Sequence, residues 1–478
     1  MNPLKAISFT AIEKVLRLIG NIAFLAVSAR NLEPEELGVF AIIFSIYQIL
    51  RVFIGGSLVN AFLKSDHTNE IRDKLFSFSI IFSLMGFLLF IVIRPLIENV
   101  FDVTFTHPTY LLMSMVLFLL PINLFSRGIL QEKRSFDKIA ISEIIVFYIS
   151  IIIGITILLT SPSILALAVK FFAESMLILL VYRYLLGIAP KLNLTYINRK
   201  DIHLLRFALG LSSSRFLTEL SNNGTNLFVG YFYPIKFMAF FSYSKNLALI
   251  PETFLRTTIS GPMMVYLSKY SGKESFQKFQ TIASSLLFVS MMPASLLVLK
   301  GDQLLVLLMG TKWAEFGLMF QILGIFGMAQ VLKGWLTVVY TNNMHMRDWN
   351  KFVFLELFLI LLLMGICSSL GLSIFGFIVG ISLFEVVFWS IIYATTNFKF
   401  ITEKNNWKQY LLNYQLFICP LLILVIVHPV LVYFIDINLT LSVLLGGTLA
   451  SGIVFIYLAI CNRSVFASFL KLIQSQTD

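Results

Sequence analysis

The sequence predicts an all-α, polytopic membrane protein of about 14 transmembrane helices, because about fourteen apolar runs, each near the 20 residues that cross a bilayer, follow one another along the chain. Of its 478 residues, 58% are hydrophobic and 13% are charged, whereas an average soluble domain has about 25% charged residues. The mean hydropathy is +0.88. Charged side chains inside several runs indicate a polar interior, since such groups face a watery cavity or a partner rather than lipid.

The apolar runs divide into two groups of six and a final pair. The first run is not a cleavable signal peptide, because Glu13, Lys14 and Arg17 lie where an uncharged segment is required. Turn residues such as Pro34 and Gly371 separate neighbouring runs. The predicted spans are 9–29, 38–62, 75–97, 109–131, 138–160 and 162–186, then 204–231, 238–262, 279–299, 315–340, 351–370 and 373–396, and finally 410–433 and 438–461.

A polar interval near residues 187–203 predicts a linker between two six-helix lobes. A faint repeat supports this division, because in residues 29–44 and 229–244 a span ends, a proline marks the turn and a new apolar helix begins. We therefore expect a first lobe at 1–190, a cytoplasmic linker at 191–203, a second lobe at 204–400, and an extra helix pair with a cytoplasmic tail at 401–478.

The net charge of +11 reflects membrane topology rather than nucleic-acid binding. Lys and Arg cluster in every second loop, for example at Lys64, Arg72 and Lys74, whereas the loop at Glu33 and Glu35 is acidic. By the positive-inside rule, this alternation predicts that both termini are cytoplasmic. We expect no nucleic-acid partner.

The cysteines and histidines give no sign of a metal site. Cys367, Cys419 and Cys461 lie far apart within apolar runs and form no C-x-x-C motif. The five histidines show neither H-x-x-x-H nor H-E-x-x-H spacing. We expect no metal and no cofactor. Coupling to an H⁺ or Na⁺ gradient is left open as the energy source for transport.

Three short patches resemble one transporter family, and the order of the predicted helices extends the resemblance over most of residues 1–400. The patches are S-A-R-N-L-E-P-E-E-L-G-V-F-A closed by G-G-S-L-V-N-A-F at 55–62, F-S-Y-S-K-N-L-A-L-I-P at 241–251, and G-T-K-W at 310–313. These patches resemble bacterial polysaccharide flippases of the O-antigen and colanic-acid type, which share the MOP superfamily with MATE multidrug exporters. One departure is Met238-Ala239-Phe240-Phe241, where many relatives have an L-G-Y-Y-like turn.

The resemblance implies a two-lobe, MATE-like fold with a central cavity and alternating access. It further implies that the cargo is an undecaprenyl-diphosphate-linked oligosaccharide, flipped from the cytoplasmic to the periplasmic leaflet of the bacterial inner membrane for surface polysaccharide (O-antigen or exopolysaccharide) assembly. A polymerase and a chain-length regulator would be partners in the same pathway. Membrane lipid would surround the acyl tail.

Such a cargo carries two anionic phosphates, so the carrier should hold cations at membrane depth. Several deep charges form i,i+4 pairs that either neutralise each other or line the cavity: Glu13 with Arg17, Lys170 with Glu174, Arg215 with Glu219, and Glu252 with Arg256. Others have no acid three or four positions away and are favoured as cavity cations. The candidate cavity cations are Lys14, Arg17, Arg51, Arg215, Lys245, Arg256 and Lys333.

Two further sets of polar residues are candidates. Glu143, Glu356 and Glu385 lack a local cation, so each is a candidate for ion coupling, for accepting sugar hydroxyls, or for a salt bridge to another helix. A polar run in the span 204–231 either joins helices or forms a cavity wall that binds sugar. The candidate wall residues are Ser214, Glu219, Asn222 and Asn223.

Three functional classes make different demands on the spans and the deep charges of such a chain. A flippase of lipid-linked oligosaccharide explains the spans, the deep cations and the resemblance. A MATE-like multidrug exporter should favour deep acids, because its cargo is usually cationic. An integral polymerase or ligase should expose a catalytic loop, but the predicted outside loops are short and the sequence has no D-x-D or G-x-S-x-G motif. The sequence therefore predicts a transporter rather than an enzyme.

Overall fold

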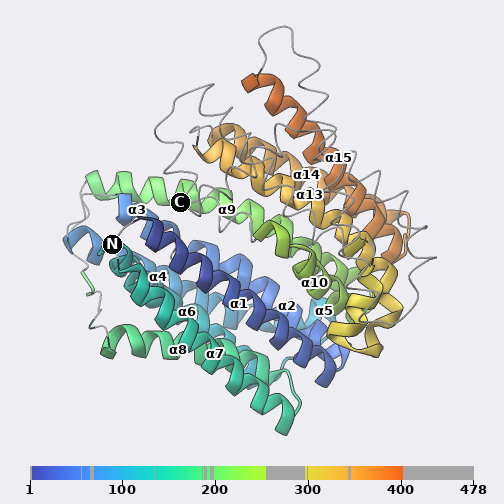
Figure 1. The fold of residues 1–478 in the computed structure, drawn as a ribbon, viewed down its shortest axis with the longest axis horizontal. Coiled ribbons are helices and arrows are strands. Elements are labelled where there is room, and N and C mark those ends of the chain that lie inside the picture. The colour runs from blue at the N-terminus through green and yellow to red at the C-terminus, as the bar shows by residue number, and fades with distance from the viewer. Residues whose placement is uncertain are drawn as a thin grey trace, which may run out of the picture. The chain divides into compact units, whose positions relative to one another are not determined.

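The computed structural model describes residues 3–54, 56–64, 69–133, 135–185, 187, 191–193, 199–253, 297–298, 300–342 and 346–401. Within these residues the regular structure is helical, and no strand occurs among them (Figure 1). The described chain contains eight helices long and apolar enough to cross a membrane. The all-α membrane fold is thus confirmed. The predicted spans 410–433 and 438–461 lie outside the described residues, as do most of the span 279–299 and the end of the span 238–262.

The chain divides into two compact units, Met1–Ser242 with Val353–Ile360, and Tyr243–Phe352 with Leu361–Asp478. The predicted lobe boundary at 191–203 remains a prediction. The helices of the first unit are α1 (Pro3–Asn31), α2 (Pro34–Leu50), the 3₁₀ turn η1 (Arg51–Phe53), α3 (Gly56–Lys64), α4 (Asn69–Val92), α5 (Arg94–Phe101), α6 (His107–Glu132), α7 (Phe136–Thr160), α8 (Leu165–Leu180), the π-helical turn η2 (Val181–Leu185) and α9 (Arg199–Phe232).

Helix α10 (Ile235–Ala248) contains the boundary between the units. The later elements are η3 (Thr311–Phe316), α13 (Gly317–Asn342), α14 (Met346–Ser369) and α15 (Ile374–Ile401). Residues 300–309 are also helical, although a loop was expected there. Lys300, which follows the predicted span 279–299, is a buried helical residue.

The predicted span 38–62 is broken in the structure. Glu36 accepts the backbone N–H of Glu33 at 3.0 Å and Pro34 occupies the first turn, so α2 begins with satisfied backbone groups. The helix then tightens into η1 at Arg51, and α3 starts afresh at Gly56. We refer to residues 51–54, together with the start of α3 at Gly56, as the helix break. Broken helices at membrane depth are tolerated where they are enclosed by protein or line a polar space.

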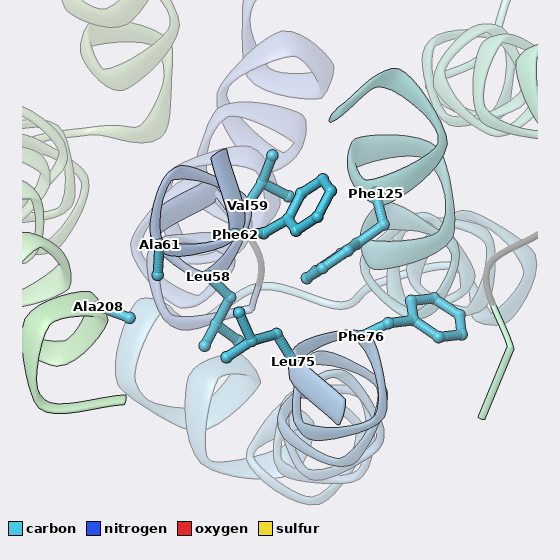
Figure 2. Close-up of a cluster of buried hydrophobic side chains, with 8 residues drawn as sticks. All are labelled: Leu58, Val59, Ala61, Phe62, Leu75, Phe76, Phe125 and Ala208. Carbon is cyan, nitrogen blue, oxygen red and sulfur yellow. The ribbon is translucent and has the colours of Figure 1, made fainter. Parts of the chain in front are cut away.

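The short helix α3 is held in place by a hydrophobic core (Figure 2). Phe62 of α3 lies against Phe125 of α6, and Phe125 meets Phe76 of α4 edge to face with ring centroids 5.6 Å apart. Edge-to-face pairs of this kind add to the free energy gained by burial. The core consists of Leu58, Val59, Ala61, Phe62, Leu75, Phe76, Phe125 and Ala208, and so joins α3 to α4, α6 and α9.

Four helices of the first unit pack in sequence beside this core. Helix α1 packs on α7, α7 on α8, and α8 on α6 (Figure 1). A Cβ added at Gly20 of α1 would lie 2.6 Å from the ring of Phe147 on α7, so only glycine permits this approach. The hydroxyl of Tyr148 donates to the carbonyl of Leu16 at 2.9 Å and fixes the register of the pair. This close packing brings charged side chains of α1, α6, α7 and α8 together.

Candidate functional site

The first unit contains a connected set of ion pairs on α1, α6, α7 and α8, which we call the ion network. Its members come from positions far apart in the chain, and their side chains are between fully buried and about one-third exposed. The network consists of four cations and three carboxylates, namely Lys14, Arg17, Arg127 and Lys170 with Glu13, Glu143 and Glu174.

The buried carboxylate of Glu13 has three cations around it. Lys14 Nζ lies 3.1 Å away, Arg17 Nε 3.7 Å and Arg127 Nη2 4.0 Å. The pairing of Glu13 with Arg17 was predicted from their spacing. Lys14 has no acid three or four positions away and was favoured as a free cavity cation. The structure corrects this, because the long flexible stem of Lys14 brings its ammonium back to the adjacent Glu13.

Glu174 of α8 is held by two cations. Lys170 Nζ lies 2.8 Å from Glu174 Oε2, as their i,i+4 spacing predicted, and Arg17 Nη2 lies 2.5 Å from Glu174 Oε1. The second contact joins α1 to α8 across 157 positions of sequence, so no local pattern could have revealed it. Through Arg17 the two predicted pairs become one network.

Glu143 of α7 is paired with a cation from another helix. Arg127 Nε of α6 lies 3.3 Å from its carboxylate, and the hydroxyl of Tyr182 donates to it at 2.8 Å. Tyr182 lies in the π-helical turn η2, a distortion that re-aims side chains and often marks functional sites. Arg127 lies near the end of the predicted span 109–131 and is not among the candidate cations of the sequence. Of the three roles left open for Glu143, the structure shows the salt bridge to another helix.

Two exposed arginines lie beside the helix break. Arg51 begins η1, and its guanidinium lies close enough to the phenol of Tyr47, one turn earlier, to interact with it electrostatically. Arg215 of α9 approaches the other side of the break, because a Cβ at Gly56 would lie 2.9 Å from its Nη1 atom. The rings of Phe53 and Phe216 pack at 4.9 Å and hold α9 against η1.

The polar run of α9 is partly used within the protein. Asn223 Nδ2 donates to Glu219 at 2.8 Å, and Thr225 donates to the carbonyl of Asn222 at 2.8 Å. Asn226 reaches Ser45 of α2 at 3.4 Å, which joins the two helices. These bonds support the helix-joining role for part of the run, while the wall role of Glu219, Asn222 and Asn223 stays a prediction. The side chain of Ser214 lies outside the described residues.

In the second unit, each of the two described candidate cations lies near an aromatic ring. Lys333 Nζ lies 5.3 Å from the ring centroid of Trp389, and Lys245 Nζ lies 5.6 Å from that of Phe326. Both lysines are buried, at 6% and 3% exposure, so this structure places neither of them at a solvent-filled surface. Arg256 lies outside the described residues.

The carboxylate of Glu385 on α15 accepts two hydrogen bonds. Gln330 Nε2 of α13 donates at 2.8 Å and Trp389 Nε1 at 2.9 Å, both to Oε2. Glu356 of α14 is fully buried and belongs to the first compact unit. Among the described residues, no group of three or more His, Cys, Asp or Glu side chains could hold a metal ion. Cys367 is a buried free thiol, and the other two cysteines lie outside the described part.

Comparisons with known proteins give a family and a fold. A family model described as "Polysaccharide biosynthesis protein" matches residues 27–318. The chain is similar to the lipid II flippase MurJ in an inward closed conformation, with a TM-score of 0.69 and 14% identity over 94% of this chain and 98% of that one. No curated protein matches.

Two transporters of the MOP superfamily are also similar. An inward-facing multidrug resistance MATE family transporter gives a TM-score of 0.64 at 14% identity, over 80% of this chain and 94% of the other. A MOP superfamily transporter from Pyrococcus furiosus, whose binding pocket is described as reversed in polarity, gives 0.58 at 14% identity over 84% and 96%. At such identities the likeness concerns the fold.

Proposed function

The chain belongs to the polysaccharide biosynthesis protein family and has the fold of MOP superfamily transporters, and we propose that it is a transporter rather than an enzyme and flips lipid-linked oligosaccharide across a membrane. The cargo is an undecaprenyl-diphosphate-linked repeat unit, moved across the bacterial inner membrane by alternating access for the assembly of O-antigen or exopolysaccharide. The observation that carries the proposal is the ion network, which holds four cations against three carboxylates.

The helix break is the proposed entry point for the diphosphate. Arg51 and Arg215 are exposed guanidinium groups, and a planar fork binds phosphate oxygens with two parallel hydrogen bonds. Ser57, near the start of α3, has a buried hydroxyl without a hydrogen-bond partner among the described residues. A phosphate oxygen at the break would give this hydroxyl an acceptor.

The remaining candidates have secondary roles in this proposal. Sugars would contact the polar run of α9 at Asn222 and Asn223. Glu385, a buried carboxylate that accepts hydrogen bonds from Gln330 and Trp389, would be a site for H⁺ or Na⁺ coupling. We further propose that both termini are cytoplasmic and that a polymerase and a chain-length regulator act on the delivered units. Lys245 and Lys333 would engage cargo only in a conformation that uncovers them.

The test is where lipid-linked oligosaccharide accumulates when the gene is deleted in its own host. Accumulation of single repeat units on the cytoplasmic leaflet with loss of surface polysaccharide supports the proposal. Complementation by Arg51→Ala should then fail at normal protein abundance, whereas Arg206→Ala, an exposed arginine near the start of α9, should restore surface polysaccharide. Full complementation by Arg51→Ala and by Lys333→Ala would remove both residues from the site.

A MATE-like multidrug exporter is the second candidate, favoured by the similarity to MATE transporters. Normal surface polysaccharide in the deletion strain together with altered drug sensitivity would support it. Buried acids such as Glu385 would then be the residues to substitute, because a cationic cargo requires carboxylates.

A further inference from the structure

Within the ion network, the two cations that pair with Glu174 differ in how exposed their side chains are. Lys170 is 3% exposed and Glu174 18%, whereas Arg17 is 26% exposed. Both cations contact the same carboxylate, but only Arg17 retains access to its surroundings. We infer that Glu174 is an exchangeable counter-ion, which holds Arg17 in the unloaded carrier and gives it up to an anionic group of the cargo while remaining paired with Lys170. This inference rests on the proposed function.

The bond between Lys170 and Glu174 is the permanent one. The ammonium of Lys170 lies among three aromatic rings, with centroid distances of 4.3 Å to Phe171, 4.9 Å to Phe147 and 6.0 Å to Phe24. Ring faces attract the ammonium but do not replace a counter-ion, and removing one partner of a buried pair leaves an uncompensated charge. A Cβ at Gly154 would lie 3.0 Å from Lys170 Cβ, so α7 closes the remaining space around the lysine stem.

Arg17, by contrast, is held in an orientation suited to exchange. Its guanidinium carbon lies 4.6 Å above the ring of Phe147, which fixes the plane of the group without using its N–H donors. Glu174 takes Nη2 at 2.5 Å, and Glu13 interacts with Nε at 3.7 Å, beyond good hydrogen-bonding distance. An incoming phosphate can therefore replace Glu174 on a guanidinium that is already positioned.

The exchange leaves no carboxylate without a partner. When Arg17 turns to the cargo, Glu174 keeps Lys170 at 2.8 Å, and Glu13 keeps Lys14 at 3.1 Å. A single Arg–Glu pair would lack this property, since its carboxylate would be left unpaired in a poorly hydrated site. Glu174 thus acts as a positioning residue that competes with cargo and promotes its release.

The test compares binding with transport in Glu174→Gln, using the full chain in lipid nanodiscs and farnesyl diphosphate as the probe. Removing the competing charge should tighten probe binding about five- to tenfold while transport in cells falls, because release becomes slow. A residue with a merely structural role would weaken both. Glu132→Gln, at the end of α6, is the matched control and should change neither.

If Glu174→Gln does not fold, the double variant K170M/E174Q removes the buried pair together and leaves Arg17 without Glu174. Tighter probe binding in either folded variant supports the inference. Wild-type binding of the probe with unchanged or weaker binding in a folded variant would overturn the inference alone. If the wild-type chain binds neither the probe nor its natural cargo, both the inference and the proposed function fail.

Discussion

The carboxylate of Glu98 shows how single residues organise one loop outside the predicted membrane spans. The backbone N–H of Phe105 donates to it at 2.9 Å, and Arg94 binds it at 3.0 Å. These contacts, the Phe105 bond first, hold the pKa of Glu98 below its ordinary value. Arg94 also donates to the carbonyl of Phe105 at 2.6 Å and contacts His107, so the carboxylate supports the whole turn after α5.

A pH dependence follows from this lowered pKa. A carboxyl group with a depressed folded-state pKa stabilises the fold above its unfolded pKa, and that stabilisation is lost as pH falls through the folded value. Hydrogen exchange of residues 102–106 should therefore lose protection on acidification between about pH 5 and pH 3. In Glu98→Gln the protection should be lower at neutral pH and lack this acid step. An identical acid step in the variant would assign it to another group.

Prediction from sequence was uneven at the residue scale. The pairs Glu13–Arg17 and Lys170–Glu174 follow from helical spacing, which any single helix reveals. The contact that joins them, from Arg17 to Glu174, depends on how α1 packs beside α8 and leaves no local trace. The pairing of Arg127 with Glu143 was not predicted either, because it depends on how α6 packs beside α7.

At the scale of elements, substitution of two glycines by alanine is expected to have opposite effects on stability. A Cβ at Gly38 would lie 2.3 Å from the carbonyl oxygen of Ile235, and backbone cannot move aside without separating α2 from the start of α10. At Gly56 the nearest atom, 2.9 Å away, is the end of the flexible Arg215 side chain. Gly38→Ala should destabilise the protein by about 1–3 kcal/mol, as overpacking does. Gly56→Ala should leave stability nearly unchanged.

Thermal unfolding of the purified variants in detergent measures this difference, and surface polysaccharide in a complemented deletion strain measures transport. Gly56→Ala should fold normally yet transport poorly, since it displaces Arg215 from the helix break. A loss of stability equal to that of Gly38→Ala would show that the break tolerates no side chain. Normal transport in a folded Gly56→Ala would separate Arg215 from cargo binding.

The helix break itself was not predicted. Residues 38–62 are so uniformly apolar that hydropathy gives one continuous span, and a Gly-Gly pair at 55–56 was interpreted only as part of a family-like patch. Glycine at position 56 weakens a helix, and α9 packs against the 3₁₀ turn that begins at Arg51. Composition therefore identifies a span, while tertiary packing decides whether it is continuous.

At the scale of the whole molecule, the fold class was predictable because it depends on composition, and the described helices agree closely with most predicted spans. The compact units divide at Ser242, because α9 packs against α2 and α3. A polar interval in the sequence cannot reveal that packing. Spacing also cannot separate paired charges from those facing a cavity, and so the candidate cations range from the buried Lys245 to the exposed Arg51.

The predicted orientation of the chain determines in which half of the bilayer the ion network lies. If the N-terminus is cytoplasmic, residues 13–17 of α1 lie in the cytoplasmic half of the bilayer, together with Arg127 near the end of α6 and Glu143 near the start of α7. Lipid-linked cargo is proposed to load from that leaflet, so its diphosphate would meet the network soon after entry.

Cysteine labelling tests this orientation. Thr104 and Lys133 are exposed at opposite ends of α6, whose 26 residues extend about 39 Å. In a background without native cysteines, an impermeant maleimide should label Thr104→Cys in intact cells and Lys133→Cys only after permeabilisation, because basic loops remain inside. The reverse pattern would place the ion network in the outer half of the bilayer. The network would then meet the cargo at release, and Glu174 would act only in that final step.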